Sequence, residues 1–139
     1  MNYAEFLAAK KIADRPSGFE CDESLIPSKA FEFQRDVIKW QTKRGRSAVF
    51  FDCGLGKTIT QLSFGQQIVE ETNKPFLLLA PNEVVKQTIK EGSKFGIEAT
   101  HVKGDGDVVT GINITNYEKL HKFNALQFSG LLILGAFCA

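Results

Sequence analysis

The chain alternates between continuous apolar runs and segments in which apolar residues recur at helical spacing. Apolar runs favour strands at 47–51, 76–80, 98–102, 108–114 and 130–134. Helical spacing favours helices over 30–44, 58–70, 84–95 and 117–123, with a further short helix within 1–14. The runs at 76–80 and 130–134 are apolar throughout, which is typical of parallel strands covered on both faces. The sequence therefore predicts an α/β fold with a mostly parallel central sheet.

Breaks in this pattern divide the chain into two parts. Pro16 with Gly18, and then Pro27, interrupt the first part. Residues 1–28 are predicted to be an N-terminal segment and linker, and residues 29–139 one domain. With 139 residues and 43% hydrophobic content, the chain is long enough and apolar enough to bury one core.

Helix faces and helix ends can also be predicted. Phe33, Val37 and Trp40 recur at helical spacing, so they are expected to form the buried face of the first helix in this domain. Asn82 is predicted to cap the helix that follows the central strand, because its side chain can accept a backbone N–H. Gly96 is predicted to end the same helix.

Composition excludes several classes of function. The formal net charge is +1, so no global basic field indicates a nucleic-acid ligand, and any contact with DNA must be local. No apolar stretch reaches about 18 residues and no signal-peptide pattern opens the chain, so we expect no membrane span and a cytoplasmic protein. Cys21, Cys53 and Cys138 lie far apart and are predicted to be reduced thiols. His101 and His121 lack partners at metal-ligand spacing and are interpreted as ordinary residues.

Residues 52–58, with the sequence DCGLGKT, carry the clearest chemical signal in the chain. Phosphate needs closely spaced backbone N–H groups, and Gly54 and Gly56 let the backbone approach it. Lys57 supplies a cation, Thr58 offers a hydroxyl to Mg²⁺, and the positive end of the following helix faces the anion. The segment predicts a nucleoside-triphosphate site formed by Cys53, Gly54, Leu55, Gly56, Lys57, Thr58 and Ile59. Lys57 and Thr58 are the predicted catalytic residues, and Thr58 is the predicted metal ligand.

The general phosphate-loop pattern is met only in part. G-x-x-x-x-G-K-[ST] requires a glycine at position 51, where this chain has Phe51. The alternative is that the Gly-Leu-Gly segment only caps a strand before an ordinary helix. The preceding strand, Lys57 and Thr58 together favour the phosphate loop over that alternative.

Further segments occur in a fixed order along the chain. They are FEFQRDVIKW at 31–40, FDCGLGKT at 51–58, LAP at 79–81, EGSKFGI at 91–97 and ITNYEKL at 114–120. In this order the chain resembles superfamily 2 helicases of the DEAD/DEAH-box-like group, and most of all their phage and prophage branch related to Swi/Snf-type translocases. The resemblance covers nearly the whole chain. It implies a three-layer, RecA-like P-loop domain, the first motor domain of an ATP-dependent DNA helicase.

The same resemblance implies roles for residues outside the phosphate loop. Gln34 would bind the adenine edge of ATP, and Phe31 or Phe33 would support that pocket. An amide suits adenine because it donates and accepts hydrogen bonds at once. The motifs that contact the backbone of one DNA strand, with little sequence preference, correspond to Pro81, Asn82, Thr115, Asn116 and Tyr117.

The chain departs from the family at its motif II, an apolar strand that ends in Asp-Glu. Here residues 131–133 are followed by LGAFCA, which contains no carboxylate. Without those two side chains Mg²⁺ lacks a second anchor and nothing orients the attacking water, so hydrolysis is expected to fall by orders of magnitude. We therefore expect a domain that is incomplete at its C-terminus and lacks the second half of the motor. Our hypothesis is that the apolar tail results from a frameshift or a truncated reading frame.

Two functions stay open at this point. The first is the ATP-binding part of a DNA helicase or translocase, not competent alone, and in the bacterial host cytoplasm if phage-encoded. The second is a non-catalytic nucleotide-binding module or a truncated remnant, since a sheet cut after its fifth strand exposes an apolar edge. A small-molecule kinase is disfavoured because it leaves Gln34, Pro81 and Asn116 unexplained.

Overall fold

The computed structural model describes residues 2–10, 16–49 and 56–133. The helices are α1 (Tyr3–Lys10), α2 (Glu32–Arg44), α3 (Lys57–Thr72) and α4 (Asn82–Lys94). The strands are β1 (Phe76–Leu79), β2 (Ala99–His101), β3 (Ile112–Thr115) and β4 (Gly130–Ile133). Short 3-10 helices complete the list: η1 (Glu23–Leu25), η2 (Asp105–Asp107), η3 (Tyr117–Lys122) and η4 (Ala125–Gln127).

The four described strands form one sheet in the order β2-β3-β1-β4, and every neighbouring pair is parallel. Leu79 of β1 pairs with Thr115 of β3 and with Ile133 of β4, so these strands end at the same level. The predicted α/β class and parallel sheet are confirmed, and the arrangement is consistent with part of a RecA-like domain.

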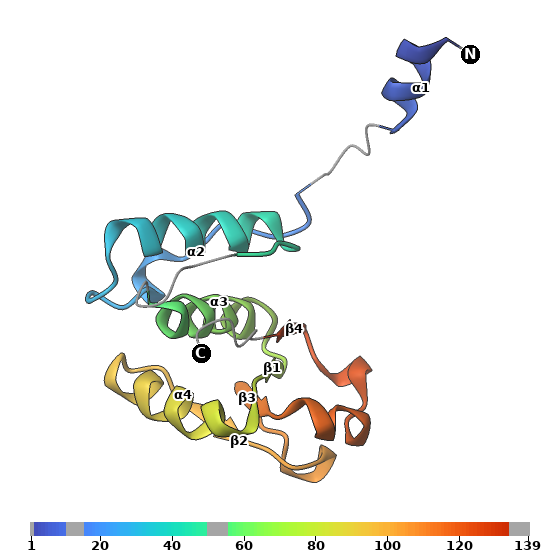
Figure 1. Ribbon diagram of the computed structural model, residues 1–139. Coiled ribbons are helices and arrows are strands. Elements are labelled where there is room, and N and C mark those ends of the chain that lie inside the picture. The colour runs from blue at the N-terminus through green and yellow to red at the C-terminus, as the bar shows by residue number, and fades with distance from the viewer. Residues whose placement is uncertain (1, 11–15, 50–55, 134–139) are drawn as a thin grey trace.

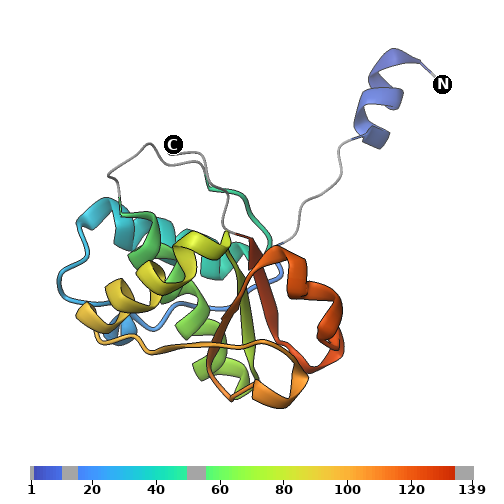
Figure 2. The same ribbon diagram turned by 60° about the horizontal axis from the view of Figure 1, so that its bottom comes forward.

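Helices α3 and α4 cover one face of this sheet (Figures 1 and 2). Leu62 of α3 and Val85 of α4 join Phe76, Leu78 and Ile114 of the strands in one buried cluster. All five side chains are at most 1% exposed. Full burial of such a side chain stabilises the fold by about 1.5–3 kcal/mol, so this cluster is the main source of stability for the sheet and both helices.

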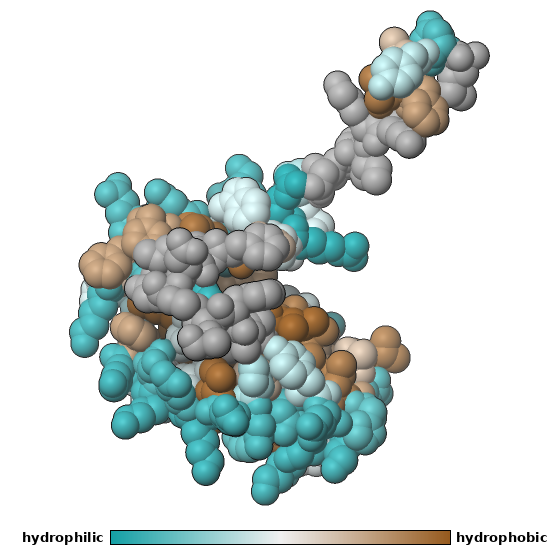
Figure 3. Space-filling model, viewed as in Figure 1, coloured by the Kyte–Doolittle hydropathy of each residue, from teal (hydrophilic) through white to brown (hydrophobic). Residues whose placement is uncertain are grey.

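The second face of the sheet is covered only in part. Figure 2 shows the segment with η3 and η4 on the side of the sheet opposite α3 and α4. This segment covers Leu77 of β1, which is 2% exposed. On β4, in contrast, Leu131 is 51% exposed and Ile133 is 63% exposed. Figure 3 shows apolar side chains on the surface beside β4, next to the hydrophilic surface of α4.

Helix α2 lies on the outer side of α3, and its buried face differs from the predicted one. Phe33 is 42% exposed and Trp40 is 49% exposed, whereas Ile38 is fully buried and Gln34 is 4% exposed. The prediction that Phe33, Val37 and Trp40 form the buried face is therefore wrong for Phe33 and Trp40, and Val37 is half-buried. The helix faces α3 with the side that carries Ile38, which packs in a small cluster with Ile26, Ala30 and Ile59.

Two predicted strands differ from the structure. Residues 47–49 are not part of a strand, and the rest of the strand predicted at 47–51 lies outside the described residues. Residues 108–111 form a loop, because the buried amide of Asn113 accepts from Val109 N (2.9 Å) and donates to Val109 O (2.9 Å) and Gly111 O (3.2 Å). These bonds satisfy backbone groups that would otherwise pair with a neighbouring strand of the sheet. The strand thus begins at Ile112.

Helix ends follow the predictions closely but not fully. Pro81, not Asn82, is the N-cap residue of α4, and Asn82 is its first helical residue. Gly96 follows the helix with φ of 75°, a left-handed conformation that favours glycine, so the predicted stop is confirmed. The helix predicted at 117–123 is the 3-10 helix η3.

The segment before α2 is attached to the domain through a buried amide. Gln67 of α3 is 2% exposed. Its Nε2 donates to Asp22 O at 2.7 Å, and its Oε1 accepts from Asp22 N at 2.9 Å. Gly18 and Phe19 donate backbone bonds to the last turn of α2. The boundary between residues 1–28 and 29–139 stays a prediction, and these contacts show what connects the two parts.

Replacement of Gln67 by Leu should lower the free energy of unfolding by about 1–3 kcal/mol, because both backbone groups of Asp22 lose their partner. The matched control is Gln66→Leu on the same helix, since Oε1 of Gln66 is buried with no partner among the described residues. That change should be within about 0.5 kcal/mol or stabilising. Urea denaturation followed by circular dichroism measures both. Equal losses in the two variants would contradict the role of the Gln67 amide.

Candidate functional site

The start of α3 is built on a glycine that no other residue replaces without strain. Gly56 is the N-cap residue, with φ of 76° and ψ of 47°, in the left-handed region. Lys57 and Thr58 follow as the first two helical residues, and both are half-buried. The hydroxyl of Thr60 donates to Gly56 O at 3.2 Å, which fixes the first turn. The first backbone N–H groups of a helix lack intrahelical acceptors, so this end attracts an anion.

The side chain of Gln34 lies directly against this turn. Its Oε1 accepts from Phe31 N at 2.9 Å, which orients the amide. A Cβ built on Gly56 would overlap Nε2 of Gln34. Two residues that the sequence assigned to one ligand are therefore in contact across α2 and α3. The φ angle of Gly56 favours glycine, and a Cβ there would also displace the amide of Gln34.

An aromatic pair stands beside Gln34 on the outer side of α2. The rings of Phe31 and Phe33 are stacked with centroids 6.1 Å apart and an interplanar angle of 12°. Phe31 is 68% exposed, although exposed large aromatic side chains usually gain by burial. The pair offers a flat apolar surface next to an amide, which is an arrangement that suits a planar heterocycle.

Part of the predicted loop can be placed and part cannot. Cys53, Gly54 and Leu55 lie outside the described residues. Ile59 is 3% exposed and packs in the cluster between α2 and α3, so it supports the turn from behind. Lys57, at the N-terminus of a 16-residue helix, adds a positive charge where the helix dipole is already positive.

A second group of predicted residues meets at the carboxyl ends of β1 and β3. Asn82 and Asn116 are joined by a hydrogen bond from Asn116 Nδ2 to Asn82 Oδ1, at 3.4 Å. Oδ1 of Asn116 also accepts from Lys119 N at 3.2 Å, which caps η3. Tyr117 is 42% exposed, whereas Thr115 is fully buried. The parallel pairing of β1 with β3 thus brings Pro81, Asn82, Asn116 and Tyr117 together at one edge, with Thr115 beneath them.

Sequence reasoning missed a cationic cluster at this same edge. His101, the last residue of β2, has a pKa below the usual value of about 6.5, first because of burial and then because of Lys119, Lys103 and Lys86. Its Nε2 is buried and has no hydrogen-bond partner among the described residues. The four residues come from three elements and one loop, so no local motif in the sequence identifies them.

The described residues offer few ligands for a divalent metal ion. No group of three His, Cys, Asp or Glu side chains at metal-binding distance occurs in the described part of the chain. Strand β4 ends at Ile133 without a carboxylate. The hydroxyl of Thr58 is a single oxygen ligand, whereas Mg²⁺ prefers near-octahedral oxygen coordination and usually takes one or two carboxylates.

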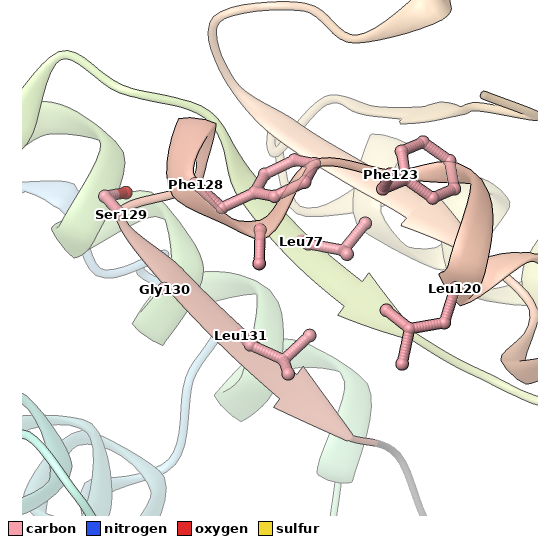
Figure 4. Close-up of a pocket in the computed structure, with 8 residues that line it drawn as sticks. Leu77, Leu120, Phe123, Phe128, Ser129, Gly130 and Leu131 are labelled. Atoms are coloured by element: carbon pink, nitrogen blue, oxygen red, sulfur yellow. The ribbon is translucent and has the colours of Figure 1, made fainter. Parts of the chain in front are cut away.

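An apolar pocket of about 200 Å³ lies on the second face of the sheet (Figure 4). Leu77 and Leu131 of the strands and Leu120, Phe123 and Phe128 of the η3–η4 segment line it. No charged side chain is among its lining residues, so it offers nothing to a phosphate or a metal ion. We assign it to incomplete packing over β1 and β4.

Comparison with known proteins identifies a family. The family described as "Type III restriction enzyme, res subunit" (ResIII) matches the chain over residues 23–132. No match to a curated protein is found. None of the described helices has the length and apolar content needed to cross a membrane.

Replacement of Gly56 by Ala should lower the free energy of unfolding by about 1–3 kcal/mol, because Ala is strained at a positive φ. The overlap with Gln34 adds to this cost. Gly111→Ala is the control, since a Cβ there meets no atom within 4 Å. It should change stability by no more than about 0.5 kcal/mol. Guanidinium titrations that gave the same small change for both variants would show that Gly56 is not constrained.

Proposed function

The chain belongs to the type III restriction enzyme res subunit family, a helicase-like family of nucleoside triphosphatases, and we propose that it is the ATP-binding part of an ATP-dependent DNA helicase or translocase. Among superfamily 2 helicases, we propose that it belongs to the phage and prophage branch related to Swi/Snf-type translocases, because of its motif order. The proposal rests on the contact between Gln34 and Gly56, because this contact places an amide that suits adenine beside a turn that suits phosphate.

The residues present fit the phosphates of ATP. Gly56 is the N-cap residue of α3, and the first N–H groups of a helix lack intrahelical acceptors, so they can bind an anion. Lys57 would neutralise charge on the phosphates. Cys53, Gly54 and Leu55 would complete the loop, and Ile59 holds the turn in place from the core.

The residues also fit the base of ATP. Gln34 is held by its bond to Phe31 N, so its amide is oriented before a ligand arrives. Pre-orientation lowers the entropy that binding would otherwise cost. The stacked rings of Phe31 and Phe33 give the adenine a surface to lie on.

Hydrolysis is the step that this chain supports least. Thr58 offers one hydroxyl to Mg²⁺, and residues 131–139 contain no acidic side chain that would add a second ligand or orient water. The described residues alone therefore do not fit a catalytic magnesium site. We propose that this chain binds ATP and that turnover requires groups from outside it. The alternative, a non-catalytic nucleotide-binding module, is favoured by the exposed Leu131 and Ile133 of β4.

The partner is proposed to be DNA, held mainly through its backbone. Pro81, Asn82, Asn116 and Tyr117 meet at one edge of the sheet and carry amides and a hydroxyl that suit phosphate and sugar. Thr115 is fully buried, so in this arrangement it supports the edge and does not touch the strand. Such contacts give little sequence preference.

Replacement of Lys57 by Ala should weaken binding of a fluorescent ATP analogue at least tenfold, because the phosphates lose their cation. The control is Lys74→Ala, an exposed lysine before β1, which should bind as the unaltered chain does. ATP hydrolysis is measured in parallel, with and without DNA. We expect binding without turnover above background.

Two results would change this picture. DNA-stimulated turnover that disappears in Lys57→Ala would show that other groups of this chain replace the missing carboxylates. Equal binding of the analogue by the unaltered chain and by Lys57→Ala would remove the proposed ATP site.

Replacement of Tyr117 by Ala should weaken binding of a single-stranded oligonucleotide several-fold, since an exposed aromatic residue at the strand edge contributes about 1–3 kcal/mol when it stacks on a base. Tyr3→Ala is the matched control, because Tyr3 is the other tyrosine of the chain and is 76% exposed on α1. Fluorescence anisotropy measures both affinities. A loss of similar size in both variants would argue against a specific role for Tyr117.

A further inference from the structure

The side chain of Gln34 is held by the protein at both ends of its amide. Gln34 is the third residue of α2, and Phe31 is the N-cap residue of that helix. Oε1 of Gln34 accepts from Phe31 N at 2.9 Å, which is one half of a capping box. A Cβ built on Gly56 would overlap Nε2 of Gln34, whereas it would lie 3.3 Å from Cδ, so the nitrogen end is the one nearest this turn. Gln34 is 4% exposed, which leaves the amide little room to move.

Hydrogen-bond chemistry determines which end of the amide faces which way. Phe31 N is a donor, and the oxygen is the atom of an amide that can accept its hydrogen. Rotation of the amide by half a turn would place N–H groups against Phe31 N, donor against donor. The oxygen of Gln34 is therefore committed to the start of α2. Nε2, which carries two N–H groups, is the end that faces the turn at Gly56.

Adenine and guanine differ at the base edge that such an amide can bind. Both purines carry the acceptor N7, beside which adenine has an amino donor and guanine has a carbonyl acceptor. Selection of adenine through this edge needs an acceptor and a donor that face the base together. A donor alone can bind N7 of either purine. Gln34 turns its donor end toward the proposed nucleotide site, while its acceptor end is bonded to Phe31 N.

The aromatic pair beside Gln34 does not separate the two purines either. The rings of Phe31 and Phe33 are stacked with centroids 6.1 Å apart, and the two residues are 68% and 42% exposed. Every base has a π-face, so stacking on an aromatic side chain adds affinity with little dependence on the identity of the base. Stacking and a single donor together favour a purine, but they do not favour adenine over guanine.

We propose that this site takes purine nucleoside triphosphates as a class, with Nε2 of Gln34 donating to N7, so that ATP and GTP bind alike. This inference rests on the proposed function and defines the substrate class of the same site. Gln34 is then the residue that distinguishes a purine from cytosine, which presents an amino donor at the corresponding edge. The same nitrogen packs against Gly56, so base and phosphates are bound on either side of one amide.

A series of nucleotides tests the inference without any substitution. Each unlabelled nucleotide displaces a fluorescent ATP analogue from the chain, and the midpoint gives its affinity. GTP and purine riboside triphosphate, which lacks the amino group of adenine, should bind within about threefold of ATP. In 7-deaza-ATP a carbon replaces N7, so one hydrogen bond is lost and binding should be about tenfold weaker. CTP should bind at least about tenfold more weakly than ATP.

A conservative variant assigns the effect to Gln34. In Gln34→Glu the carboxylate still accepts from Phe31 N, and glutamate is a usual residue at this position of a capping box, but the donor is lost. The added negative charge should weaken every triphosphate to the same extent, so the measured quantity is the ratio of the affinities for ATP and 7-deaza-ATP. This ratio should fall from about ten to about one. Gln87→Glu makes the same change at an exposed position of α4 and should leave the ratio unaltered. Urea titrations show that both variants are folded.

The outcomes separate this inference from the proposed function. ATP that binds far more tightly than both GTP and purine riboside triphosphate would show that the site reads the amino group of adenine. That result would overturn the inference while the ATP site stands. Equal affinities for ATP and 7-deaza-ATP in the unaltered chain would overturn it in the same way. No displacement of the analogue by any nucleotide would overturn both.

Discussion

Parallel pairing of the strands is the constraint on which the rest of this structure depends. Because all the described strands run in the same direction, their carboxyl ends meet at a single edge of the sheet. Figure 2 shows α3 and α4 beginning at that same edge. In open α/β sheets ligands bind at the carboxyl ends of the strands, where helix N-termini also gather. Gly56, Asn82, Asn116 and His101 are therefore placed near this edge by topology, although they are far apart in the sequence.

Apolar residues predicted an element well where they occupy its buried positions, and they misled where polar residues occupy those positions. Strand β1 is buried on both faces, so its apolar run alone identifies it. Helix α2 shows the opposite case, since Gln34 and Gln41 are buried while Phe33 and Trp40 are exposed. A hydrophobic periodicity cannot identify the buried face when the inner positions are taken by amides. Local consistency is expected to fail at functional positions, and Gln34 is a residue of the proposed ATP site.

A sequence pattern could predict only those residues of the candidate site that are neighbours in the chain. Gly56, Lys57 and Thr58 are neighbours, so a pattern could name them. Gln34 was assigned to the same ligand only through resemblance, and its contact with Gly56 was not predicted, because no spacing rule connects α2 to the start of α3. The lysines that lower the pKa of His101 were not predicted either, since Lys86, Lys103 and Lys119 belong to separate parts of the fold. Asn113 is a similar case, because its amide replaces part of a ladder with side-chain bonds.

Local charge, and not net charge, decides whether this chain can hold a polyanion. A net charge of +1 gives almost no long-range field. At physiological salt, however, exposed charges more than about 8 Å apart are largely screened from one another, so the acidic residues on distant surfaces do little to oppose a cluster. Lys86, Lys103 and Lys119 each lower the pKa of His101, whereas Asp107 accepts a hydrogen bond from Lys103 N and brings a negative charge to the same loop. The field at this edge is therefore set by the balance of nearby charges and not by the total of +1.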